Sequence, residues 1–162
     1  MSDVLGFTGT AHLPATHREV VHRGLLEIME SIHPEVPERV VTGACVGVDE
    51  YIFFWFRAYY PDVPQTVVFP ADRKAVDLTE GEVRVTGHTV VCMPPGTSYR
   101  QRNEKIVELS GMVGAFWTGQ KRSGTYMTMN IARKAGKIVP EYIFGVGLPD
   151  QEVRTRYRSF TS

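Results

Sequence analysis

Two arginines stand at the start of a predicted helix, where positive charge is normally unfavourable. Arg100 and Arg102 both lie in its first turn. A cation at this position opposes the helix dipole and destabilises the helix unless an anion lies nearby. A phosphorylated ligand would remove the conflict, and Asn103 beside Arg102 would hold its ribose or base. The alternative is a solvated surface on which an arginine pairs with Glu104 or Glu108.

The next predicted helix begins with the same mismatch of charge. Lys121 and Arg122 precede it, and Ser123, Gly124 and Thr125 open it. Hydroxyl groups and the free amides at a helix start form a nest that suits phosphate. We therefore interpret Ser123, Gly124 and Thr125 as phosphate ligands.

A glycine-containing loop links the second predicted strand to the second predicted helix. Gly43, Ala44 and Gly47 leave free amides at the positive end of that helix, which favours an anion. Asp49 lies in its first turn, where it either stabilises the dipole or holds a ribose hydroxyl. Cys45 is either a nucleophile or a small buried hydrophobe, and the sequence places no histidine beside it to activate it.

A third loop, Thr8, Gly9 and Thr10, follows the first predicted strand. It lacks the GxGxxG spacing, so its glycine either admits a phosphate or makes a tight turn. The five histidines show no spacing typical of metal ligands. We expect no metal site, no required cofactor and surface positions for the histidines.

The composition is that of an ordinary globular protein. The chain has 162 residues, of which 43% are hydrophobic, and 18 Lys and Arg balance 18 Asp and Glu. These values exclude a disordered chain, and the apolar run Ile52–Phe56 is far too short to span a membrane. Two cysteines are too few for a disulfide framework, and no signal peptide is visible, so we expect a cytoplasmic protein. Without net positive charge, nucleic-acid binding needs a local basic patch.

Predicted strands and helices alternate along the chain. This order predicts an α/β protein: a Rossmann-like three-layer α/β/α sandwich with a mainly parallel central sheet, forming a single domain over 1–162 with a tail over 145–162. Capping-box patterns at Thr16–Glu19 and Ser98–Gln101 mark two helix starts. The polar stretch 70–87 is interpreted as a mobile or functional insertion. The predicted strands are 4–7, 39–42, 65–69, 89–93, 112–117 and 137–144.

The Phe-rich second helix predicts contact with another subunit. Phe53, Phe54, Trp55 and Phe56 are consecutive and cannot all share one helical face. We therefore expect a homo-oligomer with its interface at this helix.

The loops together resemble a known superfamily over residues 4–143. The sequence is similar to the Rossmann-like domain of the DprA/Smf family of DNA-processing proteins and to the lysine-decarboxylase-like (LOG) proteins, both of the SLOG superfamily. The resemblance is to small stand-alone members found in bacteria and phages. The motifs that carry it are TGxxxGVD at 42–49, RNxxIxxLS at 102–110 and SGTxxT at 123–128.

The resemblance implies a protein that binds a nucleotide or a nucleotide derivative at these loops. The phosphoribohydrolases of the superfamily carry a glutamate in a PGGxGTxxE segment. The corresponding stretch Gln120–Thr128 has no carboxylate. We therefore expect binding without that hydrolytic activity.

Two alternatives remain open. One is an enzyme of N-glycosidic bonds, either a nucleotide phosphoribohydrolase or a deoxyribosyltransferase, with Glu104, Asp49 or Asp72 as the catalytic carboxylate. The other is a single-stranded DNA-binding protein of the DNA-processing type, in which Tyr99 or Tyr126 stacks on bases while the cations at the two helix starts follow the phosphates.

Overall fold

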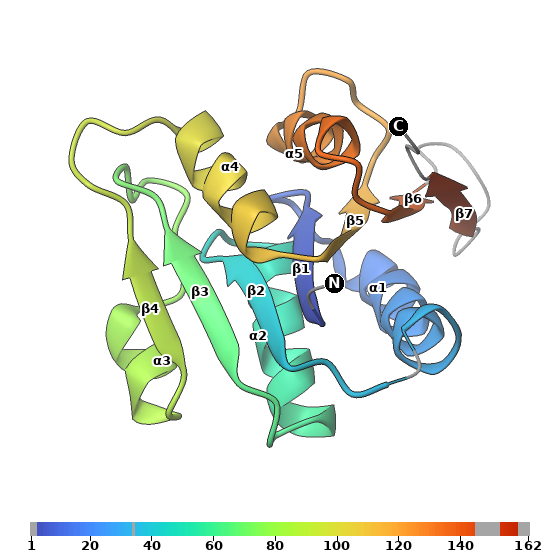
Figure 1. Ribbon diagram of the computed structural model, residues 1–162, viewed down its shortest axis with the longest axis horizontal. Helices are drawn as coiled ribbons and strands as arrows, with labels where there is room; N and C mark the ends of the chain where they lie inside the picture. Colours follow the sequence, from blue (N-terminus) through green and yellow to red (C-terminus); the bar gives the residue numbers. More distant parts are fainter. Residues whose placement is uncertain (1–2, 34, 145–152, 159–162) are drawn as a thin grey trace.

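One seven-stranded sheet forms the centre of the molecule (Figure 1). The computed structural model describes residues 3–33 and 35–144 and the backbone of 153–158. The strand order is β4-β3-β2-β1-β5-β6-β7, with β1 to β6 parallel and β7 antiparallel to β6, which confirms a mainly parallel sheet. The strands are β1 Val4–Gly9, β2 Arg39–Gly43, β3 Gln65–Phe69, β4 Thr89–Cys92, β5 Met112–Trp117, β6 Val139–Phe144 and β7 Val153–Arg158.

Helices cover both faces of this sheet, so the three-layer sandwich is confirmed (Figure 1). On one face lie α1 Ala15–Glu27, which continues into the π-helical turn η1 Ile28–Ile32, with α2 Val48–Tyr59 and α3 Glu80–Val85. On the other face lie α4 Tyr99–Leu109 and α5 Gly124–Lys134.

The central strands are apolar at nearly every position because both of their faces are covered. Val67 packs with Phe53 of α2 on one face, whereas its neighbour Val68 packs with Ile106 of α4 on the other. Successive side chains of a strand point to opposite faces, so a continuous apolar run is what a doubly covered strand requires. This packing holds the strand ends, and the loops that follow them, in fixed positions.

The segment 70–87, predicted as an insertion, is tied to the rest of the fold. It contains α3, which begins with a capping box between Thr79 and Glu82. The backbone N–H of Val46 donates to the carbonyl of Ala75 at 2.9 Å, and Cys45 and Val76 form an isolated β-bridge. The segment therefore braces the loop between β2 and α2.

The aromatic run of α2 divides between core and surface. Phe53, Trp55 and Phe56 are buried, whereas Phe54 is exposed. The expected homo-oligomer remains a prediction, and Phe54 is the exposed side chain of this run that another subunit would contact.

In the tail, the backbone of β7 pairs with β6, and positions 145–152 and 159–162 lie outside the described residues. No helix of the described residues is long and apolar enough to cross a bilayer.

Candidate functional site

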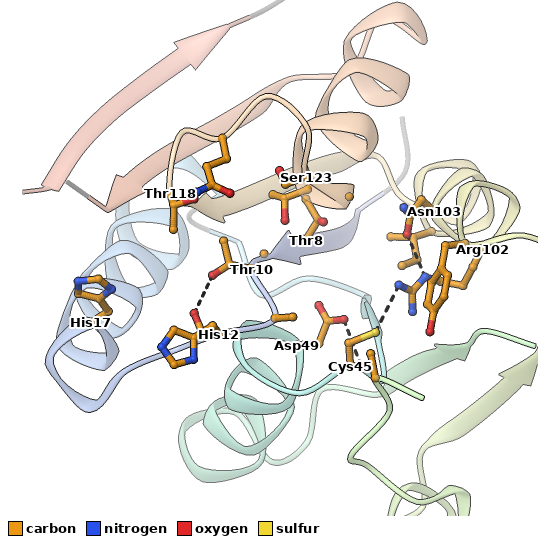
Figure 2. Close-up of a pocket in the computed structure, with 18 of the residues that line it drawn as sticks. Thr8, Thr10, His12, His17, Cys45, Asp49, Arg102, Asn103, Thr118 and Ser123 are labelled. Carbon is orange, nitrogen blue, oxygen red and sulfur yellow. Dashed lines mark hydrogen bonds between the residues drawn. The ribbon is translucent and has the colours of Figure 1, made fainter. Parts of the chain in front are cut away.

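A cavity of about 640 Å³ opens at the carboxyl ends of β1, β2 and β5. Its walls come from the loops that follow these strands and from the first turns of α4 and α5 (Figure 2). The chain runs from β1 to β2 on one side and later places β5 on the other side of β1. Ligands of open α/β sheets bind at such a topological switch point. The volume is in the range of small-molecule sites.

Most residues predicted for the site come together in this cavity. The fold achieves this because the loops after parallel strands share one edge of the sheet. The predicted residues that line it are Thr8, Gly9, Thr10, Asp49, Arg102, Asn103, Ser123, Gly124 and Thr125.

Four predicted residues lie outside the lining. Ala44 is fully buried in the core beside α3, and Gly43 lies beneath the cavity floor. Gly47 has a φ of +96° and lets the loop after β2 pass against the carbonyl of Thr10, where a Cβ would lie 2.5 Å from that oxygen. The structure thus gives Gly47 a packing role. Glu104 faces outward and pairs with Arg100 at 3.8 Å, so its catalytic assignment is a prediction that this geometry does not favour.

Five polar side chains of the cavity are each more than nine-tenths buried. Among the described residues, the hydroxyls of Thr8 and Thr125 have no hydrogen-bond partner, and the first two amides of α5 have none within the helix. Both hydroxyls face the open cavity, so they are free to bond with a ligand there. The exposed fractions are Thr8 8%, Asp49 7%, Arg102 6%, Asn103 5% and Thr125 4%.

The guanidinium of Arg102 is held only by neutral groups. It donates to Oδ1 of Asn103 at 2.9 Å, to the carbonyl of Val68 at 3.4 Å and towards Sγ of Cys45 at 3.6 Å, and it lies over the ring of Tyr99. Within the described part of the protein, no carboxylate oxygen lies within 4 Å of it. The charge of Asp49 attracts this guanidinium without forming an ion pair with it, so the guanidinium remains available to bond an anion in the cavity.

Asp49 is a buried carboxyl with altered acidity. Burial raises the pKa of Asp49 to about 6, and the charge of Arg102 and the N–H of Cys45 oppose that rise only in part. Its Oδ2 accepts from this N–H at 3.3 Å. A carboxylate has room for further hydrogen bonds, so Asp49 retains acceptor capacity towards the cavity that it lines.

Cys45 also lines the cavity, in surroundings that disfavour the thiolate form of its side chain. Burial raises the pKa of the Cys45 thiol, and the carboxylate of Asp49 raises it further, while Arg102 acts in the opposite direction. The thiol rather than the thiolate is then the prevalent form at neutral pH. This favours the interpretation of Cys45 as a small apolar wall residue.

Sequence reasoning missed part of the lining. His12 is exposed and His17 half-buried, in keeping with the predicted surface positions, but both also line the cavity, next to Pro14 at the start of α1. The signal that could have found them is their place in the sequence, because they follow the β1 loop, which is itself predicted to belong to the site. Thr118 and Gln120 follow β5 in the same way, and they too line the cavity.

The exposed cations lie outside the cavity, and the two tyrosines have contacts within the protein. Lys121 and Arg122 are exposed and do not line the cavity. The ring of Tyr126 stacks on Trp117 with centroids 5.4 Å apart. Tyr99 lines the cavity, its hydroxyl donates to the carbonyl of Asp72 at 3.1 Å, and the guanidinium of Arg102 lies over its ring.

Comparison with known proteins reveals the fold but no family model. No protein-family model matches the sequence, and no curated protein matches it either. Among solved structures, the protein is similar to DNA processing protein A (DprA) from Streptococcus pneumoniae, with 18% identity and a TM-score of 0.58. The match covers 83% of this chain and 48% of that chain, so this protein spans about half the length of DprA. The similarity establishes a Rossmann-like fold of the DprA type.

Proposed function

We propose that this protein binds a nucleotide or a nucleotide derivative in the cavity, through the phosphate of that ligand. The observation that carries the proposal is the buried guanidinium of Arg102, which has no carboxylate partner among the described residues and lines a cavity with other unpartnered donors. Asp49 interacts with this cation through charge alone, without an ion pair, whereas a bound anion would bond to it directly, and a phosphate accepts several hydrogen bonds at once.

The proposed phosphate site combines donors of three kinds: a guanidinium, hydroxyls and backbone amides. Arg102 contributes charge, Thr8 and Thr125 contribute hydroxyls, and the first amides of α5 contribute partial positive charge at the helix start. Ser123 contributes its hydroxyl proton, because its oxygen accepts from the amide of Tyr126 at 3.1 Å. Asp49 accepts from a ribose hydroxyl. No part of this set requires a cofactor.

The positions of the carboxylates support binding without turnover. The stretch Gln120–Thr128 has none, and Glu104 is directed away from the cavity into its pair with Arg100. A phosphoribohydrolase needs a carboxylate next to the glycosidic bond.

One observation favours a catalytic alternative. Asp49 lines the cavity, and its pKa of about 6 suits a general acid or base near neutral pH. An enzyme acting on an N-glycosidic bond is therefore the second candidate. Free base released from nucleoside monophosphates, and abolished by Asp49→Asn, would establish it; no release after prolonged incubation excludes it.

Single-stranded DNA binding is the third candidate, and it depends on the exposed cations Arg100, Lys121 and Arg122. A shift of labelled single-stranded DNA in a gel, lost as salt is raised, would support it. No shift at low salt excludes it.

The direct test of the proposal is calorimetric titration with the four ribonucleoside monophosphates and with a cyclic dinucleotide. We expect at least one to bind, and Arg102→Ala to weaken that binding about tenfold or more, the cost of losing a charged hydrogen bond. Arg100→Ala is the matched control on the outer face of the same helix, and its affinity should equal that of the wild type. Absence of binding by every compound, or equal losses in both variants, overturns the proposal.

A further inference from the structure

The two ends of the cavity differ in chemistry. Figure 2 shows Arg102 and Asn103 on one side and His12 and His17 on the opposite side, with Thr8 between them. The Arg102 end carries the charge, the buried donors and the ring of Tyr99, one face of which is covered by the guanidinium. The opposite end is lined by Pro14 and by imidazole rings, which present flat surfaces.

The ring of His17 is held in place from behind. It stacks on Phe144 of β6, with centroids 4.9 Å apart and an angle of 22° between the ring planes. Phe144 is buried in the core, so it cannot move aside. The backbone N–H of His17 donates to the carbonyl of Pro14 at 2.9 Å, which fixes the first turn of α1. A flat side chain that is already ordered loses little conformational freedom when a ligand stacks on it.

Hydrogen-bonding groups lie beside this flat wall. Thr118 and Gln120 line the same cavity, and Figure 2 shows Thr118 on the same side as His17. The hydroxyl of Thr118 has no hydrogen-bond partner among the described residues. A hydroxyl and a carboxamide offer both donors and acceptors to the edge of a heterocycle, whereas an apolar ring would leave them unpaired.

We propose that His17 is the stacking wall for the heterocyclic base of the ligand, which makes the ligand class a nucleoside phosphate and not a simple sugar phosphate. The inference rests on the proposed function, because the phosphate at the Arg102 end directs the remainder of the ligand towards His17. His17 is a specificity-determining residue: it contributes to the affinity for nucleotides and not to the affinity for phosphate.

The test compares two probes, adenosine 5′-monophosphate and ribose 5-phosphate, by calorimetric titration of the full-length protein. The variants are His17→Ala, which removes the ring, and His17→Phe, which keeps a flat ring without nitrogen. His33→Ala is the control, since His33 bonds to the carbonyl of Glu35 away from the cavity. Thermal unfolding of each variant verifies that it is folded.

We expect the wild type to bind the nucleotide more tightly than the sugar phosphate. His17→Ala should weaken nucleotide binding about tenfold, the scale of base stacking on an aromatic ring, and leave sugar phosphate binding unchanged. His17→Phe should retain nucleotide binding. Equal affinities of the wild type for both probes, or an unchanged nucleotide affinity in His17→Ala, overturns the stacking role while the phosphate site stands. If neither probe binds the wild type, the stacking role fails for adenosine 5′-monophosphate, and the proposed function fails only if the other nucleotides of the calorimetric panel do not bind either.

Discussion

The Nε of Arg102 donates to Oδ1 of Asn103 across 2.9 Å, and this bond determines which end of the Asn103 amide is turned away. Arginine only donates, so the group that faces it must be the oxygen. The amide nitrogen of Asn103 then lies 3.9 Å from the point where a Cβ on Gly124 would be. The amide nitrogen also donates towards Sδ of Met127 at 4.0 Å, so the carboxamide lies between the guanidinium and the first turn of α5.

Asn103→Asp should remove the amide donor without changing the shape of the side chain. The new carboxylate still accepts from Arg102, but it replaces a donor with a negative oxygen that repels phosphate. We expect adenosine 5′-monophosphate affinity to fall at least about tenfold, with no loss of melting temperature. Calorimetry and thermal unfolding measure the two effects, and Asn130→Asp on α5, outside the cavity lining, is the control. Unchanged affinity in Asn103→Asp would contradict a role for the carboxamide.

Gly43→Ala should displace two side chains of the site, because Gly43 lies beneath them. A Cβ at this position would lie 2.6 Å from both Nη1 of Arg102 and Oδ2 of Asp49, so both side chains must shift. We expect weaker nucleotide binding and a loss of stability of about 1 to 3 kcal/mol, as for overpacked cores. The control is Gly81→Ala, where the nearest atom is 3.9 Å away. Wild-type affinity in Gly43→Ala would show that the positions of Arg102 and Asp49 do not matter.

Asp49 should make stability depend on pH. Its pKa is raised from 3.8 to about 6, so the folded protein holds this proton more tightly than the unfolded protein. Stability therefore falls as the pH rises from about 4 to about 6, and the cost persists above that range. Asp49→Asn should remove this cost, which lowers the free energy of unfolding at neutral pH by an amount on the order of 2 kcal/mol.

Urea unfolding at pH 4 and pH 7 gives the free energy of unfolding of the wild type and of the variant. The contribution of Asp49 is the change, between the two pH values, in the difference between these free energies. The same substitution at Asp62, an exposed residue after α2, is the control. A difference that does not change with pH would show that Asp49 is not buried in its charged state.

Alkylation of Cys45 should report occupancy of the cavity. The thiol lines the cavity and its pKa is raised, so iodoacetamide should modify it slowly, and a bound nucleotide should slow the reaction further. Mass spectrometry of the intact Cys92→Ser protein measures the rate without interference from the exposed Cys92. In the wild type, the rate at Cys92 is the internal control and should be unaffected. Equal rates at Cys45 with and without a saturating nucleotide would place the ligand elsewhere.

Local sequence patterns predicted most of the elements. The run Gln65–Phe69 is a strand because both of its faces are covered, and Ser98 caps α4 through its bond with Gln101 as the capping-box pattern indicates. The capping box at Thr16 was a wrong prediction. The helix begins at Ala15 after Pro14, two residues before the start that a cap at Thr16 predicts, and no side chain caps it. Proline already sets the backbone for a helix start, which makes a polar cap dispensable.

The site was harder to predict, because charge alone does not tell which side chain is buried. Arg100 and Arg102 have the same charge and share one helical turn, but residues two apart on a helix point to nearly opposite sides. Arg102 enters the cavity, whereas Arg100 shares the outer face with Glu104. A helical projection would have separated them. The approach of His17 to Phe144 joins α1 to β6, and no local pattern contains that contact.

A crystal structure of the complex with adenosine 5′-monophosphate would decide whether the cavity is a phosphate site. We expect the phosphate inside the cavity, with its oxygens about 2.7 to 3.2 Å from the guanidinium of Arg102 and the hydroxyl of Thr125. A phosphate bound elsewhere, or a cavity that stays empty at saturating nucleotide while Arg102 remains buried, would contradict nucleotide binding at this site.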